Sequence, residues 1–251
     1  MGSFKSFFTR KKVDPEFPPL QDLSLFEIDV HSHLIPGIDD GVQTLEESIE
    51  MIKALSALGF KKLITTPHIM SDYFRNTPEI ILGGLESVRA EIKKQGIPVE
   101  LDAAAEYYLD EEFINKIKGE KLLTFGKNYV LFEVSYINPP DTLSSIIFEL
   151  IVHGYTPVLA HPERYPFWYT KFEEYYRIKE AGVLFQLNTN SLVGYYGVPA
   201  KRIAERMIDE NMIDFIGSDL HGQRHLTALQ KVSAETYLSK LAAQGVRNRT
   251  L

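Results

Sequence analysis

The feature of this sequence that most constrains its fold is an alternation of short apolar segments with amphipathic segments, repeated seven times. The apolar segments have the length of strands, and the amphipathic ones carry apolar residues at helical spacing. Strands that alternate with helices pair in parallel, because each helix carries the chain back to the edge where the next strand starts. Seven such units in 251 residues favour a closed α/β barrel over an open sheet.

The expected strands cover residues 26–30, 61–68, 99–106, 129–135, 156–160, 183–188 and 214–217. The expected helices cover residues 44–58, 78–95, 140–152, 172–181, 200–211 and 226–243. Thr44 predicts the start of the first helix, because a threonine caps free N–H groups and Glu46 and Glu47 then suit the first turn. No linker separates the units, so we expect one domain over residues 25–251 after an N-terminal tail of residues 1–24.

The tail combines aromatic side chains with positive charge, at Phe4, Phe7, Phe8, Arg10, Lys11 and Lys12. The prolines that follow disfavour regular structure, so the tail is either a disordered leader or a weak contact with a membrane surface. No run of eighteen apolar residues predicts a transmembrane helix, and the apolar stretch 4–8 is too short for a secretory signal. We expect a cytoplasmic protein, either free in the cytoplasm or at the inner face of the membrane.

Composition excludes several classes of function. The chain has no cysteine, which removes disulfides, thiolate metal ligands and a cysteine nucleophile. Its formal net charge of −7 argues against a general nucleic-acid binder, for which a basic face is expected.

Polar residues in the expected strands gather at their C-terminal ends, where barrel enzymes build their sites. In the first strand Asp29, His31 and His33 are two residues apart, so they are expected on one face. Asp219 and His221 repeat this spacing after the last strand. The candidate metal ligands are His31, His33, Asp40, His68, Glu106, Glu133, His161, Asp219 and His221.

Each of these residues has a plain alternative, such as a loop cap, a buried hydrogen bond or an ion pair with an arginine. The set is harder to explain without cations, since each close pair of carboxylates costs on the order of 4 kcal/mol at an effective dielectric of 20. Nitrogen and oxygen donors without sulfur suit two or three divalent ions, of the type Mn²⁺, Fe²⁺, Zn²⁺ or Mg²⁺.

Two arginines lie close to these ligands in sequence. Arg164 follows His161 by three residues, and Arg224 follows His221 by three. A guanidinium group matches the oxygens of a phosphate with two parallel hydrogen bonds, and the alternative for each arginine is a surface salt bridge. His153 and His225 lie away from the strand ends and are interpreted as structural or surface residues.

Six motifs in this order resemble the PHP (polymerase and histidinol phosphatase) superfamily, most closely its bacterial capsule- and exopolysaccharide-associated protein-tyrosine phosphatases. They are Asp29-x-His31-Ser32-His33, Asp39-Asp40-Gly41, Thr65-Thr66-Pro67-His68, the strand-end Glu106, His161-Pro162-Glu163-Arg164 and Ser218-Asp219-x-His221. The resemblance runs from residue 26 to the C-terminus. It implies a single distorted (β/α)7 TIM-like barrel with a trinuclear, manganese-type site. It also implies hydrolysis of phosphotyrosine in proteins, with the tail of a membrane tyrosine kinase of polysaccharide export as partner.

The resemblance also implies roles for single residues. His31, His33 and Asp219 resemble ligands of one metal, and Asp40, His68 and His221 ligands of another. Glu106, Glu133 and His161 would complete and bridge the cluster, and the match favours Asp40 over Asp39. Arg164 and Arg224 resemble the phosphate clamps, so that Arg164, Arg224, His221 and Asp219 are the expected catalytic residues.

The expected mechanism is in-line attack on phosphorus by a metal-bridging hydroxide, with a phenolate leaving group that needs little acid assistance. A phosphoesterase for histidinol phosphate or nucleotides would use the same metals. An amidohydrolase would be expected to carry a carboxylated lysine where this chain has Glu133. The alternative hypothesis without enzyme activity is a non-catalytic, metal-stabilised binding module. The loops 71–76, 107–110, 165–169 and 195–196 would form the rim that chooses among the substrates.

Overall fold

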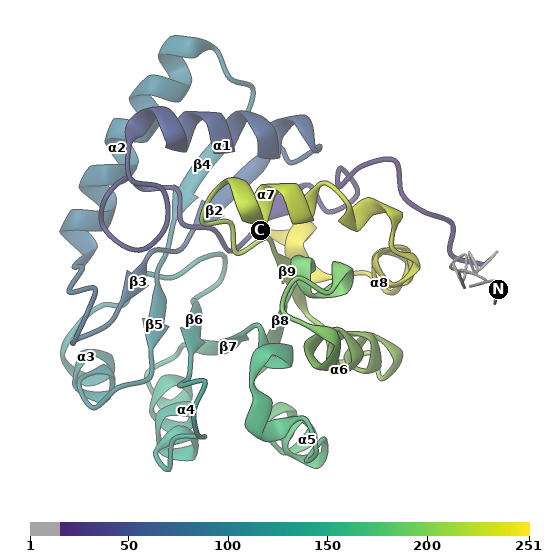
Figure 1. The fold of residues 1–251 in the computed structure, drawn as a ribbon. Helices are drawn as coiled ribbons and strands as arrows, with labels where there is room; N and C mark the ends of the chain where they lie inside the picture. The colour runs from purple at the N-terminus through teal and green to yellow at the C-terminus, as the bar shows by residue number, and fades with distance from the viewer. Residues whose placement is uncertain (1–15) are drawn as a thin grey trace, which may run out of the picture.

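The computed structural model describes residues 16–251 (Figure 1). The aromatic and basic residues of the predicted tail, at positions 4–12, lie outside the described residues. The end of the predicted tail packs against the body of the protein. Leu23 is buried, and its N–H donates to the carbonyl oxygen of Leu58 at the end of the first helix.

The strands are all parallel, as the alternation predicts. They are β1 (Ile28–Asp29), β2 (Lys62–Thr65), β3 (His68–Ile69), β4 (Glu100–Ala103), β5 (Glu106–Tyr108), β6 (Tyr129–Glu133), β7 (Thr156–Ala160), β8 (Leu184–Asn188) and β9 (Phe215–Gly217). They form a three-stranded sheet in the order β1-β2-β4 and a six-stranded sheet in the order β3-β5-β6-β7-β8-β9.

The second and third expected strands are each divided in two, which separates the sheets. β2 ends at Thr65 and β3 starts at His68, because Pro67 between them has no N–H to donate to a neighbouring strand. The neighbouring strand divides at the same level, between Ala103 and Glu106. The parallel α/β architecture of the prediction is confirmed. The sheet is a curled half-barrel, and one closed seven-stranded barrel is not seen among the described residues.

The helices are α1 (Leu45–Ala57), α2 (Pro78–Gln95), α3 (Phe113–Gly119), α4 (Leu143–Val152), α5 (Glu173–Glu180), α6 (Val198–Asp209), α7 (Gln223–Leu229) and α8 (Thr236–Gln244). Five short 3₁₀ helices lie at 162–164, 166–168, 189–193, 232–234 and 247–250. Thr44 caps α1 as predicted, in a capping box with Glu47. The sequence reasoning missed α3 and predicted one final helix where the structure has α7 and α8. None of the described helices is both long and apolar enough to span a membrane.

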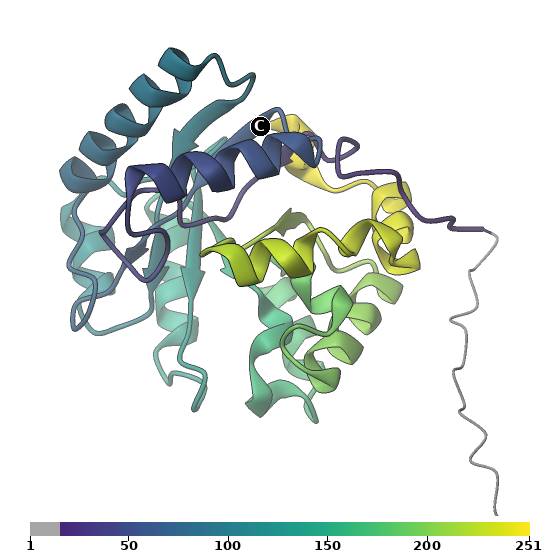
Figure 2. The ribbon, with the colours of Figure 1, turned by 45° about the horizontal axis from the view of Figure 1, so that its top comes forward.

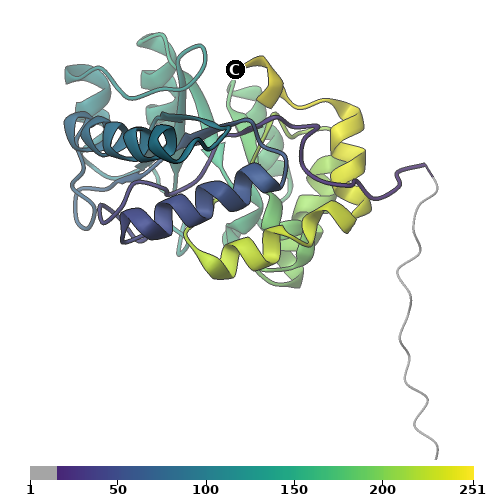
Figure 3. The ribbon, with the colours of Figure 1, turned by 90° about the horizontal axis from the view of Figure 1, so that it is seen from above.

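The helices surround the strands, and α1 and α7 lie side by side although they are far apart in sequence (Figures 2 and 3). A large apolar core fills the space between helices and strands. A smaller cluster draws buried side chains from both sheets, among them Ile64, Leu131 and Phe215. The two sheets therefore curl around a common interior, and the C-terminal ends of their strands lie at the same end of it.

Candidate metal centre

The centre starts at the end of β1, where His31 and His33 are fully buried with their Nε2 atoms 3.3 Å apart. The two histidines share a face, as their spacing predicts. Asp29 does not join them: its carboxylate accepts hydrogen bonds from the N–H and hydroxyl of Ser218, both 2.7 Å. Asp29 is thus bound to Ser218 and belongs to none of the groups of ligand atoms, and it is not among the predicted ligands.

The outer nitrogen of each histidine has a partner of its own. His31 Nδ1 lies 2.7 Å from Gln186 Oε1, and His33 Nδ1 lies 2.7 Å from Asp39 Oδ2. The same Asp39 oxygen accepts the backbone N–H of His68 at 3.1 Å. Partners of this kind fix the ring orientation and leave Nε2 directed at the centre. Asp39 thus supports the ligands, while Asp40 Oδ1 faces His68 and His221.

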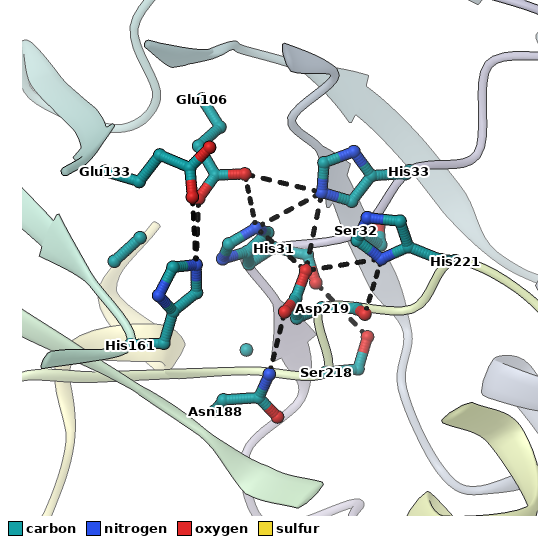
Figure 4. Close-up of polar contacts among 12 residues, drawn as sticks. His31, Ser32, His33, Glu106, Glu133, His161, Asn188, Ser218, Asp219 and His221 are labelled. Carbon is teal, nitrogen blue, oxygen red and sulfur yellow. Dashed lines mark hydrogen bonds and ion pairs between the residues drawn. The ribbon is translucent and has the colours of Figure 1, made fainter. Parts of the chain in front are cut away.

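All nine predicted ligands come together. Figure 4 labels those other than Asp40 and His68. Their ligand atoms form four overlapping groups, which are His33, Asp40, His68 and His221; His31, Glu106 and His161; His31, His33 and Asp219; and His68, Glu106 and Glu133. Glu106 belongs to two groups, with Oε1 3.0 Å from His161 Nε2 and Oε2 3.2 Å from His31 Nε2. Two donors bound to one first-row ion stand roughly 3.0–3.4 Å apart. The spacing therefore suits bridged divalent ions.

One histidine nitrogen has no other use. His68 Nδ1 is buried without a hydrogen-bond partner among residues 16–251, although it lies 3.2 Å from Glu106 Oε2 and 3.4 Å from Glu133 Oε1. A buried nitrogen aimed at two carboxylate oxygens without bonding either has the geometry of a metal ligand. The residues present therefore fit a divalent ion.

The charges of the centre are unbalanced. Burial raises the pKa of the Glu133 carboxyl well above its usual value, and the neighbouring Glu106 raises it further. Burial acts on Glu106 in the same sense, but His31 and His68 outweigh it and bring the pKa of Glu106 well below its usual value. The two acids thus compete for the same positive charge, which is the condition that bound cations relieve.

Two predicted ligands have uncommon backbone conformations. His161, directly after β7, has φ +37°, and Asp219, two residues after the end of β9, has φ +49°. Non-glycine residues adopt positive φ at a cost, and such residues gather at functional sites. Here the turn brings both side chains back over the ends of the strands.

Arg164 lies at the centre and Arg224 does not line it. Arg164 Nη1 donates to Asp219 Oδ2 at 2.6 Å, and its guanidinium group lies between the rings of Tyr136 and Tyr196, at 5.0 and 4.0 Å from their centroids. Arg224 is exposed in the first turn of α7 and is not among the described residues that line the cavity over the centre. That cavity has a volume of about 370 Å³.

The remaining histidines have the structural positions that the sequence predicts. His225 Nδ1 accepts the backbone N–H of His221 at 3.0 Å. His153 lies on the surface at the end of α4, where its Nδ1 contacts the carbonyl oxygen of Glu149.

Sequence reasoning missed three residues behind the ligands. Gln186 and Asn188 both belong to β8, and Asn188 Nδ2 donates to Asp219 Oδ2 at 2.8 Å. The sequence predicts Tyr196 only as part of a rim loop, yet it contacts Asp219 and Arg164. The signal for Gln186 and Asn188 was present, since a polar residue in a buried parallel strand needs a partner.

The comparisons with known proteins identify the family of this chain. A family model described as capsular polysaccharide synthesis, CpsB/CapC, matches residues 27–248. The chain belongs to the CpsB/CapC family. It is 29% identical over 195 residues to the tyrosine-protein phosphatase YwqE of Bacillus subtilis, covering 77% of both chains. It is 27% identical over 200 residues to the tyrosine-protein phosphatase CpsB of Streptococcus agalactiae, covering 77% of this chain and 82% of the relative.

A solved structure of the CpsB/CapC family has the same fold. The structure comes from a study of YwqE from Bacillus subtilis and CpsB from Streptococcus pneumoniae, described as metal-dependent tyrosine phosphatases. It superimposes with a TM-score of 0.75 at 28% identity and covers 82% of this chain and 85% of its own. The family membership and the curled parallel sheet therefore rest on sequence and structure together.

Proposed function

We propose that this chain is a metal-dependent protein-tyrosine phosphatase. The observation that carries the proposal is the convergence of nine nitrogen and oxygen donors beneath Arg164, at the floor of an open cavity. Its relatives are named tyrosine-protein phosphatases, which supports phosphotyrosine as the substrate.

The nine residues would hold two or three divalent ions, and Mn²⁺ fits their donors, which contain no sulfur. Such ions, when bound, lower the pKa of water and neutralise the charge of a phosphoryl group. The chain itself provides their cage, in which Asp39 and Gln186 fix the histidine rings. His221 and Asp219 have their catalytic role as part of this cage.

Arg164 would bind the phosphoryl oxygens of the substrate. Its charge is permanent, and the rings of Tyr136 and Tyr196 hold the planar fork in one orientation. The phenolate of tyrosine is a good leaving group, with an unperturbed pKa of about 10, so a strong general acid is not required. Arg224 is the proposed second phosphate clamp, on the resemblance of its motif, although its side chain is exposed and does not line the cavity.

The test is a comparison of substrates on the purified protein. A phosphotyrosine peptide, a phosphoserine peptide and histidinol phosphate are assayed with added Mn²⁺ and after chelation. The proposal expects hydrolysis of the phosphotyrosine peptide alone or by far the fastest, and its loss on chelation. Faster hydrolysis of histidinol phosphate would favour the small-molecule phosphoesterase, and no hydrolysis of any ester would favour a binding module.

We further propose that the phosphoprotein is the phosphorylated tail of a tyrosine kinase in capsule or exopolysaccharide synthesis, in the cytoplasm and close to the inner membrane face. The description of the family as capsular polysaccharide synthesis supports this partner. In this proposal the N-terminal tail contacts the membrane surface. The two sheets together are proposed to form one distorted (β/α)7 barrel. Co-sedimentation with anionic vesicles, with and without residues 1–15, tests the membrane contact.

A further inference from the structure

The mouth of the cavity is apolar, in contrast to its floor. Besides the predicted ligands, Arg164 and Ser135, the lining consists of Met70, Phe74, Tyr108, Tyr136 and Ile137. These five residues come from the segment after β3, from β5 and from the segment after β6, so they meet at the mouth from different parts of the chain. We call them the apolar collar.

Two rings of the apolar collar stand directly beside the predicted ligands. Phe74 stacks on His68 with the ring centroids 5.5 Å apart and an angle of 13° between the planes. Tyr136 stacks on His161 at 6.0 Å and 22°. A phosphoryl group held at the floor would place the phenyl ring of phosphotyrosine at the level of these two rings, because the ester oxygen joins the ring to phosphorus directly.

Ile137 lies farther out and has no packing role in the fold. Its exposed fraction is 88%, the highest of the large apolar side chains in the described part of the chain. The backbone nevertheless holds it in place. Its N–H donates to Ser135 Oγ at 3.1 Å, and Pro139 and Pro140 restrict the segment that follows. An isoleucine held at the mouth of a site and open to water is available to a ligand without reorganisation of the fold.

We propose that Ile137 is a specificity-determining residue that recognises an apolar side chain next to the phosphotyrosine in a polypeptide substrate. The inference rests on the proposed phosphatase function. Ile137 lines the same cavity as the predicted ligands and Arg164 but is 88% exposed, so a polypeptide bound through its phosphotyrosine would come within reach of it. A small aryl phosphate would end below Ile137, whereas a phosphopeptide would extend past it.

The experiment measures kcat and KM of the wild type and of Ile137→Ala on three substrates. One is p-nitrophenyl phosphate, one is a phosphotyrosine peptide with leucine on both sides of the phosphotyrosine, and one is the same peptide with serine there. Ile137→Ala is expected to lower kcat/KM for the leucine peptide about fivefold, mainly through KM, since part of one aliphatic side chain loses its contact. For the serine peptide and p-nitrophenyl phosphate, kcat/KM is expected to change less than about twofold.

Ile151→Ala is the matched control, because Ile151 is an isoleucine 46% exposed on α4 that does not line the cavity. Ile151→Ala is expected to leave kcat and KM unchanged for all three substrates. An unchanged kcat/KM of Ile137→Ala for the leucine peptide would overturn the inference. An equal loss of kcat/KM for p-nitrophenyl phosphate would overturn it as well. Failure of the wild type to hydrolyse any phosphotyrosine peptide would instead contradict the proposed function.

Discussion

Adjacent residues in the turn after β1 have different partners. Asp40 points at His68 and His221 across the metal centre, whereas Asp39 is buried behind His33 and holds the backbone of His68. The motif alone favoured Asp40 as the ligand. The contact of Asp39 with the backbone of His68 could not be predicted, because His68 lies 29 residues later in the chain.

Asp39→Asn tests the supporting role of this carboxylate. The amide keeps the size of the side chain but removes the charge that stabilises His33, so we expect metal affinity to fall about 10- to 100-fold. Competition with a chromogenic chelator measures the affinity, and Asp141→Asn on the exposed segment before α4 serves as control. An unchanged affinity would contradict the role of Asp39 as an orienting partner.

Arg164→Ala tests the phosphate contact. If Arg164 binds the transferring phosphoryl group, kcat and kcat/KM should both fall, by roughly 10²- to 10³-fold, with metal content unchanged. Arg164→Lys should restore only part of this loss, because the ammonium group keeps the charge without the planar fork. The control is Arg177→Ala, which breaks the exposed ion pair of Arg177 with Glu174 on α5. A surface salt bridge at Arg164 would predict normal turnover and a change in stability within about 1 kcal/mol.

Glu163 gives the protein a predicted dependence of stability on pH. Burial raises the pKa of its carboxyl from 4.5 to about 7, against the hydrogen bond from Ser191. The folded state therefore binds the proton more tightly, and the free energy of unfolding should fall as the pH rises from 4.5 through 7. Glu163→Gln should remove up to roughly 3 kcal/mol of this dependence. Urea unfolding of both proteins at pH 5 and pH 8 measures it, and parallel pH dependences would contradict the assignment.

At the scale of the elements, α2 shows how closely a helix packs over the segment that carries the metal ligands. Gly83 and Gly84 are neighbours in this helix, but only one of them faces the core. A Cβ atom on Gly84 would lie 2.3 Å from Cγ2 of the buried Ile35, two residues after His33, whereas a Cβ on Gly83 would meet nothing within 4 Å.

Alanine at these two positions should therefore have opposite effects. Gly83→Ala should raise the free energy of unfolding by about 0.5–1 kcal/mol, since alanine favours the helix over glycine. Gly84→Ala should lower it by about 1–3 kcal/mol, because the branched Ile35 side chain has no free space into which it can move. Urea unfolding measures both values. A stabilised Gly84→Ala protein would show that α2 shifts easily over this segment.

The helices and strands could be predicted where one local signal decides them. The bounds of α2 agree with the prediction at both ends, because Thr77 and Pro78 start the helix and Gly96 ends it with φ +62°. The division of the sheet could not be predicted, because it depends on two neighbouring strands that break at the same level. The convergence of the nine polar residues could be predicted better than the division of the sheet, since strand-end residues require only parallel strands to meet.

For the whole molecule, the candidate metal centre joins segments from both sheets, from β1 to the residues after β9. Bound ions stabilise the folded state alone, and their removal leaves four carboxylates close together. The melting temperature should therefore fall on chelation and recover when Mn²⁺ is added. Calorimetry with metal analysis measures both steps, and the same melting temperature after confirmed metal loss would contradict this contribution to stability.

Glu133→Gln separates the two causes of the fall in melting temperature on chelation, which are the loss of bound metal and the repulsion between carboxylates. The raised pKa of Glu133 favours the neutral acid in the metal-free protein, and an amide has nearly the same shape and charge as that acid. The metal-free melting temperature should therefore change little, whereas the metal-loaded one should fall, because an amide oxygen is a weaker ligand than a carboxylate. The difference between loaded and metal-free protein should narrow in the variant. If the metal-free protein instead melts much higher in the variant, Glu133 is ionised there, and repulsion between carboxylates causes more of the loss than the missing metal does.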